Sequence, residues 1–369
     1  MIPVNEPLID GNEKAYLEKC INDGWISSEG PFVSEFEEKF SSSVNRQFGV
    51  AVSSGTAAID IAIAALGLGD GDEVILPTFT IISCITQIIR SGATPVLVDS
   101  DPHSWNMDIN QVEDKITPKT KAIMAVHIYG LPVDMTPILE LADKYGLFII
   151  EDAAEVYGQT YNGKPCGSFG DISTFSFYPN KHLTTGEGGM LVTNNKLIAE
   201  KAKSFRNLCF QNKQRFVHEE LGWNYRMTNI QAAIGLAQIE RTEEFVAKKR
   251  KMGELYSNGL KNNSKLQLPL AKTDFAENIF WVFGLVLTEQ VDYDAAEAMK
   301  RLAHNNIGSR PFFWPMHEQP VLIKMGLFNN EKYPVAENLA RRGFYIPSGL
   351  AMDEEQIKEV IDVIKFELS

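Results

Sequence analysis

The chain has 369 residues, of which 44% are hydrophobic and 22% are charged. This is the composition of an ordinary globular protein, and it excludes a mainly disordered chain, a collagen-like chain and a coiled coil. The 35 lysines and arginines against 48 acids leave a net charge of −13, which argues against a general binder of nucleic acids or membrane surfaces. At about 150 residues per domain, the length predicts roughly two domains.

The four cysteines are spread along the chain without a CxxC pair. We therefore expect reduced, buried thiols and neither a disulfide framework nor a metal site. The N-terminal segment MIPVNEPLIDGNEK carries acids where a signal peptide has a basic start and an apolar centre. Asp60 and Arg90 interrupt the most apolar stretches, which fall short of the roughly 20 residues that a membrane-spanning helix needs. We expect a cytoplasmic protein with no membrane partner.

Short apolar runs alternate with helical patterns over the first two-thirds of the chain. Strands are predicted at 48–52, 73–77, 94–101, 121–127 and 147–152. These runs are nearly continuous in Val, Ile and Leu, which is typical of parallel strands covered on both faces. Alternating strands and helices predict an α/β layered domain.

The pattern changes in the last third of the chain. A polar, mostly helical stretch at 194–261 leads to a predicted strand at 278–287, a helix at 292–306 and a closing helix at 353–368. We place a domain boundary near 245–262, which divides the chain into a large domain of residues 1–250 and a small domain of residues 251–369.

Several common motifs are absent from the sequence. It has no P-loop, no GxSxG nucleophile elbow and no zinc-protease pair, and the glycines of GLGDGD follow a helix where a dinucleotide-binding turn follows a strand. Hydride, metal and acyl-transfer chemistry therefore have no support in the motifs.

The segment Ser54-Gly55-Thr56 lies where a predicted strand meets a helix. Exposed amides and the helix dipole at such a junction can hold a phosphate, because Gly55 lets the backbone approach and Thr56 adds a hydroxyl. An ordinary N-cap at Ser54 is the alternative, and it is the commoner one for this motif alone.

Two further side chains suggest chemistry with a ring-shaped cofactor. Asp152 ends the strand at 147–152, where a carboxylate points into the usual binding crevice of an α/β sheet or caps the next helix. Such a carboxylate suits a protonated heteroaromatic nitrogen of an electron-sink cofactor. Lys181 lies among apolar, aromatic and glycine residues, where desolvation would lower the pKa of its amine and make it nucleophilic, as a Schiff-base lysine requires.

The order of these parts is informative. The acid follows the phosphate-binding segment by about 100 residues, and the lysine follows the acid by about 30 residues. This order resembles the fold type I enzymes that use pyridoxal 5′-phosphate (PLP). Within them, the chain is similar over essentially its whole length to the sugar aminotransferase family called DegT/DnrJ/EryC1/StrS. The similarity to this family lies in the segments 25–40, 53–80, 92–102, 120–130, 149–158, 167–181, 184–190 and 224–240.

The resemblance implies a fold and an assembly. The expected fold is α/β, with a large domain that holds a mostly parallel seven-stranded sheet between helices and a smaller C-terminal α+β domain. The expected assembly is a homodimer with shared active sites. Asn224 would reach the cofactor phosphate from the neighbouring subunit, although the NYR motif also suits a purely structural turn.

The resemblance also implies roles for single residues. Lys181 would form the Schiff base with the cofactor and move the proton between cofactor and substrate carbons, Asp152 would pair with the pyridine nitrogen, and Glu155 would lie near the phenolic oxygen. The phosphate would be held by Ser54, Gly55, Thr56 and Ser176.

One departure concerns the cofactor ring. Where the most similar subfamily usually has an aromatic residue stacking on the ring, this chain has Ile81. An aliphatic side chain still covers the ring by dispersion but loses a stacking contribution of roughly 0.5–1.5 kcal/mol. Either the stacking is weaker here, or Phe79 substitutes.

The subfamily that the chain most resembles is that of the GDP-perosamine synthases. The implied reaction takes an amino group from glutamate and places it on C4 of a nucleotide-linked 4-keto-6-deoxyhexose, most closely GDP-4-keto-6-deoxy-mannose, for surface polysaccharide such as O-antigen. We expect Arg310 and His317, in SRPFFWPMH, to receive the anionic nucleotide and Trp25 to pack against the sugar or base; core packing explains Trp25 equally well. His127 and His182 are expected to be local structural groups.

Other activities stay open at this point. A dTDP- or UDP-linked keto sugar fits the same chemistry. Tyr178-Pro179 is similar to the PLP-dependent sugar 3-dehydratases, but those carry histidine at the lysine position, where this chain has Lys181. A third alternative is a non-catalytic regulatory protein that keeps the fold.

Overall fold

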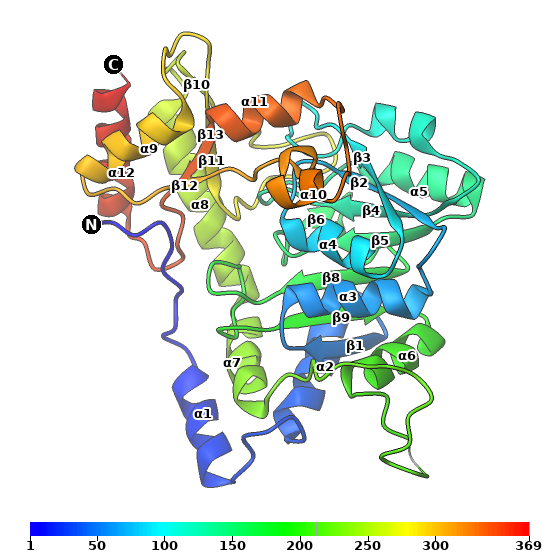
Figure 1. Cartoon of the computed structure of the whole chain (residues 1–369). Coiled ribbons are helices and arrows are strands. Elements are labelled where there is room, and N and C mark those ends of the chain that lie inside the picture. The colour runs from blue at the N-terminus through cyan, green and yellow to red at the C-terminus, as the bar shows by residue number, and fades with distance from the viewer. Residues whose placement is uncertain (212, 369) are drawn as a thin grey trace.

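The computed structural model describes residues 1–211 and 213–368. Its largest element is a seven-stranded sheet with the order β1-β9-β8-β5-β4-β2-β3 (Figure 1). The strands are β1 (Phe48–Val52), β2 (Glu73–Pro77), β3 (Thr94–Val98), β4 (Thr120–Val126), β5 (Phe148–Asp152), β8 (Ile172–Ser176) and β9 (Gly189–Thr193). Only β9 runs antiparallel to its neighbours, β1 and β8; the other pairs are parallel. The predicted α/β fold with a mostly parallel sheet is confirmed.

Helices cover both faces of this sheet, as the apolar strands require. One face packs against α3 (Gly55–Leu66), α4 (Ile82–Arg90) and α6 (Lys196–Arg206). The other face packs against α2 (Pro31–Ser43), α5 (Met135–Tyr145) and α7 (Asn229–Ile239). Local signals set the helix limits: the hydroxyl of Ser54 accepts a hydrogen bond from the amide of Ala57 at 3.1 Å, and Gly67 ends α3 with a φ of 73°.

A second, antiparallel sheet lies in the C-terminal part of the chain. Its order is β10 (Leu266–Gln267), β11 (Phe283–Leu287), β13 (Gly343–Ile346) and β12 (Arg310–Pro311). Its apolar core includes side chains of α8 (Thr242–Leu260), α9 (Ala295–His304) and α12 (Glu354–Glu367). The strand predicted at 278–287 begins only at Phe283, because Phe280 has a φ of 49°, which no extended strand accommodates.

The remaining elements are short. The helices are α1 (Glu13–Asn22), α10 (Pro320–Lys324) and α11 (Pro334–Arg342), with 3₁₀ turns η1 (Ile109–Gln111), η2 (Glu113–Lys115) and η3 (Met316–Glu318). β6 (Thr160–Tyr161) and β7 (Lys164–Pro165) form a small hairpin. Both chain ends lie beside the second sheet (Figure 1), where Ile2 pairs with Ile307.

The helix α8 connects the two sheets. Near its start, the hydroxyl groups of Thr242 and Tyr157 are 3.2 Å apart. Farther along, the buried Lys249 donates hydrogen bonds to the carbonyl oxygens of Trp281, at 2.8 Å, and Ser348. Burial lowers the pKa of Lys249 to about 7, because the charged ammonium loses its hydration.

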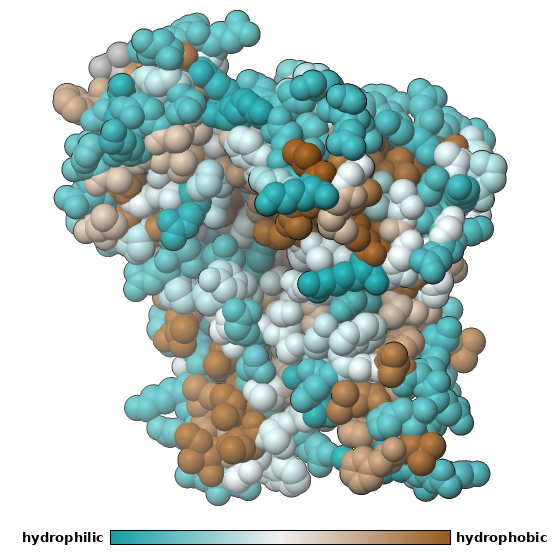
Figure 2. All heavy atoms as spheres, in the orientation of Figure 1, coloured by the Kyte–Doolittle hydropathy of each residue, from teal (hydrophilic) through white to brown (hydrophobic). Residues whose placement is uncertain are grey.

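Apolar side chains gather at the surface in two places at the bottom of Figure 2. The first, called here the α1 patch, includes the exposed residues Ile21, Trp25 and Ile26. The second, called the post-α6 patch, includes the exposed residues Phe216, Val217 and Leu221. Among the described residues, every helix is too short or too polar to span a lipid bilayer. All four cysteines are free and buried.

The contact between α2 and α7 depends on a missing side chain. A Cβ at Gly235 would lie 2.6 Å from the ring of the fully buried Phe36. We expect Gly235→Ala to lower the free energy of unfolding by about 1–3 kcal/mol, because overpacking displaces the ring. Urea denaturation of the single variants, Gly235→Ala and Phe36→Leu, and of the double variant measures this. The alanine should destabilise less in the Phe36→Leu background, and equal effects in both backgrounds would contradict the steric explanation.

Candidate active site

A cavity of about 390 Å³ opens where β4, β5 and β8 end and α3 begins. This is the edge of an α/β sheet at which ligands usually bind. Eight of the residues predicted from the sequence line it: Ser54, Gly55, Thr56, Ile81, Asp152, Glu155, Ser176 and Lys181.

The start of α3 forms one wall of the cavity and provides a place for a phosphate. The first intrahelical bond runs from the amide of Ala58 to the carbonyl of Ser54, so the amides of Gly55 and Thr56 precede the helical ladder. A Cβ at Gly55 would lie 2.8 Å from that of Ser176, so only glycine lets β8 approach the helix. The buried hydroxyl of Thr174, which also lines the cavity, has no hydrogen-bond partner among the described residues.

Asp152 is almost fully buried at the end of β5. Its Oδ1 accepts a hydrogen bond from the amide of Ala154 at 3.1 Å. Its Oδ2 accepts one from the thiol of Cys84 at 3.2 Å. The carboxylate is therefore held in one orientation at the wall of the cavity.

Lys181 lies in the loop after β8 with only 12% of its side chain exposed. Its Nζ is 3.6 Å from Oε1 of Glu155 and 3.7 Å from the centre of the Trp281 ring. Burial lowers the pKa of Lys181, against the opposing charges of Glu155 and Asp152. Burial raises the pKa of Glu155, and the charge of Lys181 partly offsets this. Both shifts favour the neutral amine, which is the nucleophilic form.

Sequence reasoning missed Trp281 and Tyr345 on the aromatic side of the cavity. Trp281, Phe313 and Tyr345 line it from the C-terminal part of the chain. The indole nitrogen of Trp281 donates to the carbonyl of Asn180 at 2.7 Å, which fixes the ring beside Lys181. The segment NIFWVFGLVL gave only a strand signal, so no local pattern separated Trp281 from core residues.

Ile81, which follows the segment PTFT (77–80), lines the cavity together with Thr80, and Ile81 is 44% exposed. Phe79 does not line the cavity. It is fully buried and packs against the rings of Tyr129, Phe312 and Phe313. The geometry therefore gives no support to the alternative in which Phe79 replaces the missing aromatic residue.

Four of the predicted residues do not line the cavity: Trp25, Asn224, Arg310 and His317. Asn224 is exposed and pairs with Asn207 beside the end of β1. The exposed Arg310 pairs in register with Tyr345. Burial and the charge of Glu155 raise the pKa of Tyr345 to about 12, and the positive charge of Arg310 opposes this rise.

The position of the His317 side chain does not agree with the prediction that it receives the nucleotide. The side chain is buried, and its Nδ1 lies 2.9 Å from the hydroxyl of Thr78. Its Nε2 lies 3.2 Å from Oε1 of Glu337. The two ring nitrogens are thus both occupied between β2 and α11, away from the cavity wall. The motif SRPFFWPMH placed His317 next to aromatic residues, but a sequence motif does not predict in which direction the imidazole ring points.

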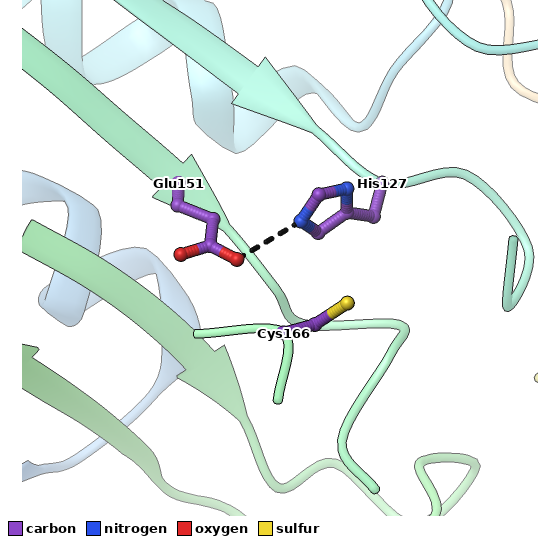
Figure 3. A group of neighbouring side chains, drawn as sticks. All are labelled: His127, Glu151 and Cys166. Carbon is purple, nitrogen blue, oxygen red and sulfur yellow. Dashed lines mark hydrogen bonds and ion pairs between the residues drawn. The ribbon is translucent and has the colours of Figure 1, made fainter. Parts of the chain in front are cut away.

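His127, which lines the cavity, forms a fully buried cluster with Glu151 and Cys166 (Figure 3). The Nδ1 of His127 accepts a hydrogen bond from the amide of Val133 at 3.1 Å, so its proton is on Nε2, which donates to Glu151 at 3.1 Å. Neither nitrogen keeps a free lone pair for a metal. Burial alone would raise the pKa of Glu151, but His127 and backbone amides lower it to about 2.

His182, next to Lys181, is buried as well. Its Nε2 is 3.3 Å from the carbonyl of Ile279. Burial and the nearby charges of Lys249 and Lys181 lower its pKa to about 3. His182 is therefore a neutral group of the interior.

The residues of the cavity fit pyridoxal phosphate. A buried carboxylate, Asp152, can hold a protonated ring nitrogen, the start of α3 can hold a phosphate, and the desolvated amine of Lys181 can react with an aldehyde. The orphaned hydroxyl of Thr174 fits a polar ligand at the same place.

The buried His182 generates a pH prediction. Between about pH 6.5 and pH 3 the unfolded chain binds a proton at His182 that the folded chain does not, so the free energy of unfolding falls as the pH falls. From pH 6.5 to 4.5 we expect the wild type to lose about 2 kcal/mol more than His182→Gln, measured by urea denaturation. The exposed His103→Gln serves as the control and should follow the wild type. Parallel losses in the wild type and His182→Gln would refute this.

Comparisons with known proteins find relatives over nearly the whole chain. The profile of the DegT/DnrJ/EryC1/StrS aminotransferase family matches residues 7–365. The GDP-perosamine synthase of Escherichia coli O157:H7 is 42% identical over 98% of this chain and 97% of its own length. That of Vibrio cholerae is 39% identical over 99% of this chain and 98% of its own.

A solved structure extends the similarity to the cofactor. The PLP-form of Spr1654 from Streptococcus pneumoniae, described as a sugar aminotransferase, superposes with a TM-score of 0.91 at 26% identity and covers 99% of this chain and 98% of its own. The chain therefore belongs to the DegT/DnrJ/EryC1/StrS aminotransferase family, and it is an aminotransferase that uses pyridoxal phosphate.

Proposed function

We propose that this enzyme transfers the amino group of glutamate to C4 of a nucleotide-linked 4-keto-6-deoxyhexose, with GDP-4-keto-6-deoxy-mannose as the substrate and GDP-perosamine as the product. Glutamate leaves as 2-oxoglutarate, and the sugar carbonyl becomes an amine, so the two halves balance. The observation that carries the proposal is the desolvated amine of Lys181 beside Glu155, in the same cavity as Asp152. The names of the relatives from E. coli and V. cholerae support the choice of sugar.

The bound cofactor supplies an aldehyde that takes up an amine and a ring that stores the electron pair released at the reacting carbon. The neutral Nζ of Lys181 accepts and returns the proton at that carbon. Asp152 keeps the ring nitrogen protonated, and Glu155 holds a proton within reach of Lys181. Trp281 covers the amine and excludes water, and Ile81 covers the ring by dispersion.

The phosphate is assigned to the start of α3. The amides of Gly55 and Thr56 and the hydroxyls of Ser54, Thr56 and Ser176 are the donors in this proposal.

The charge balance of the cavity supports a second subunit. Its described lining has three acids, Asp152, Glu155 and Glu187, against one cation, Lys181. The start of α3 serves the cofactor phosphate, but a nucleoside diphosphate needs further positive donors beyond the single cation of this lining. We propose a homodimer in which Asn224 of each chain reaches the cofactor phosphate of the other. The exposed α1 and post-α6 patches support burial against a second copy.

Three further assignments belong to this proposal. The chain divides into a PLP-binding domain of residues 1–250 and a small domain of residues 251–369, with α8 crossing the boundary. The free, buried cysteines support a reducing, cytoplasmic location. Arg310 and Trp25, both exposed, are proposed to contact the nucleotide sugar at the mouth of the cavity, whereas His317 is left out because its ring nitrogens are engaged.

A screen of GDP-, dTDP- and UDP-linked 4-keto-6-deoxy sugars with ¹⁵N-labelled glutamate, read by mass spectrometry, tests the reaction. We expect ¹⁵N in the product of the GDP-linked sugar alone. Conversion of only dTDP or UDP substrates would overturn the sugar assignment and keep the chemistry. Loss of the C3 hydroxyl without gain of nitrogen would instead identify a dehydratase.

The same assay tests the amine. Lys181→Ala should lose the visible absorption of the lysine-bound cofactor, the covalent adduct trapped by borohydride, and at least a thousandfold in rate, because a general base and nucleophile are removed together. The exposed Lys251→Ala is the matched control and should keep all three. Unchanged trapping in Lys181→Ala would refute the assignment, and cofactor binding that never depends on Lys181 would favour a non-catalytic protein.

Mixed dimers test the shared site. Lys181→Ala and Asn224→Ala homodimers should each be weak, but a refolded mixture should recover about a quarter of the wild-type activity, since half the dimers are mixed and each has one intact site. Recovery of no activity in mixed dimers that form normally would place Asn224 in its own chain's site.

A further inference from the structure

The thiol of Cys84 touches the carboxylate that faces the cofactor ring. Cys84 belongs to α4 and is fully buried. Its Sγ lies 3.2 Å from Oδ2 of Asp152 and 3.4 Å from the hydroxyl of Thr80. No sequence motif pointed to this residue, because α4 carried only an apolar helical pattern.

The direction of this hydrogen bond follows from chemistry. An ionised carboxylate only accepts hydrogen bonds, so the thiol donates to Asp152. Burial, followed by the charge of Asp152, raises the pKa of Cys84 well above its usual value. The thiol therefore keeps its proton and remains a donor over the range in which the enzyme works.

Within the described part of the chain, each oxygen of Asp152 accepts one hydrogen bond. The amide of Ala154 binds Oδ1, and the thiol of Cys84 binds Oδ2. These two bonds fix the plane of the carboxylate, which also lines the cavity. A carboxylate has about four acceptor sites, so the remaining ones are free for a ring nitrogen.

We propose that Cys84 is a positioning residue that holds the carboxylate of Asp152 for the pyridine nitrogen of the cofactor through its S–H···O hydrogen bond. The thiol donates to Oδ2 and so orients the carboxylate. A carboxylate held at the ring nitrogen keeps that nitrogen protonated. The inference concerns cofactor binding and does not depend on which sugar is the substrate.

The chain offers a matched control in Cys166. This thiol is also fully buried and lies beside a carboxylate, that of Glu151. No dashed line joins Cys166 to its neighbours in Figure 3, whereas His127 and Glu151 are joined. A comparison of the two cysteines therefore separates the hydrogen bond from the loss of a buried thiol.

Infrared spectroscopy of the whole protein without cofactor tests the hydrogen bond itself. The S–H stretching band that disappears in Cys84→Ala should lie at lower frequency than the band that disappears in Cys166→Ala. In Asp152→Asn the Cys84 band should move to higher frequency, because a neutral amide accepts more weakly than a carboxylate. Equal frequencies for the two cysteines, or no shift in Asp152→Asn, would overturn the proposal.

Cofactor affinity and spectra test the positioning role. Cys84→Ala should raise the dissociation constant of pyridoxal phosphate about three- to tenfold and lower the apparent pKa at which the absorption of the bound cofactor reports loss of the ring-nitrogen proton. Cys84→Ser should restore the affinity to within about twofold of the wild type. Cys166→Ala should leave both quantities unchanged, although its thermal stability falls.

Other outcomes decide against the role. An unchanged affinity and spectrum in Cys84→Ala would overturn it, as would equal defects in Cys84→Ser and Cys84→Ala. Because both measurements use only the protein and its cofactor, they stay informative if no keto sugar is converted, and the failure of the sugar assignment remains distinguishable.

Discussion

The carboxyl ends of parallel strands meet along one edge of a sheet, and the chemistry of this protein depends on that constraint. β4, β5 and β8 pair in parallel register, so Asp152 and Ser176 come to the same edge although they end different strands. The positive end of the α3 dipole lies at the same edge of the sheet, because α3 begins directly after β1. The sheet thus collects an acid, a phosphate-binding turn and the Lys181 loop without any of them being near in sequence.

The second constraint is the desolvation of a charged pair. Lys181 and Glu155 lie 3.6 Å apart in a mostly buried site, where full ionisation of both groups is unfavourable. Burial acts on the two pKa values in opposite directions and favours a shared proton. The net charge of −13 gives the protein an overall field that opposes a phosphorylated cofactor. A proton kept on Glu155 removes one negative charge from the cavity.

The sequence predicted what is encoded locally. Strand runs, the Ser54 cap and the acid at the end of β5 are read from neighbours a few residues away, and the structure has them at those positions. Trp281 and Cys84 were missed because their roles arise from contacts across the fold. His317 was misjudged for a related reason: Thr78 and Glu337, which engage its ring, are distant in sequence. The strand predicted at 278–287 was too long, because the left-handed residue Phe280 interrupts the apolar run and β11 begins only at Phe283.

The buried amine of Lys249 ties α8 to the aromatic side of the cavity. Its hydrogen-bond partners are two backbone carbonyls, one of them on Trp281, and leaving such a polar group unpaired in the interior is costly. Any rotation of the second sheet must therefore carry α8 with it or break the hydrogen bonds of Lys249. Trp281 also donates a hydrogen bond to the carbonyl of Asn180. We therefore expect its ring to stay fixed beside the amine of Lys181 and not to open and close over the cavity.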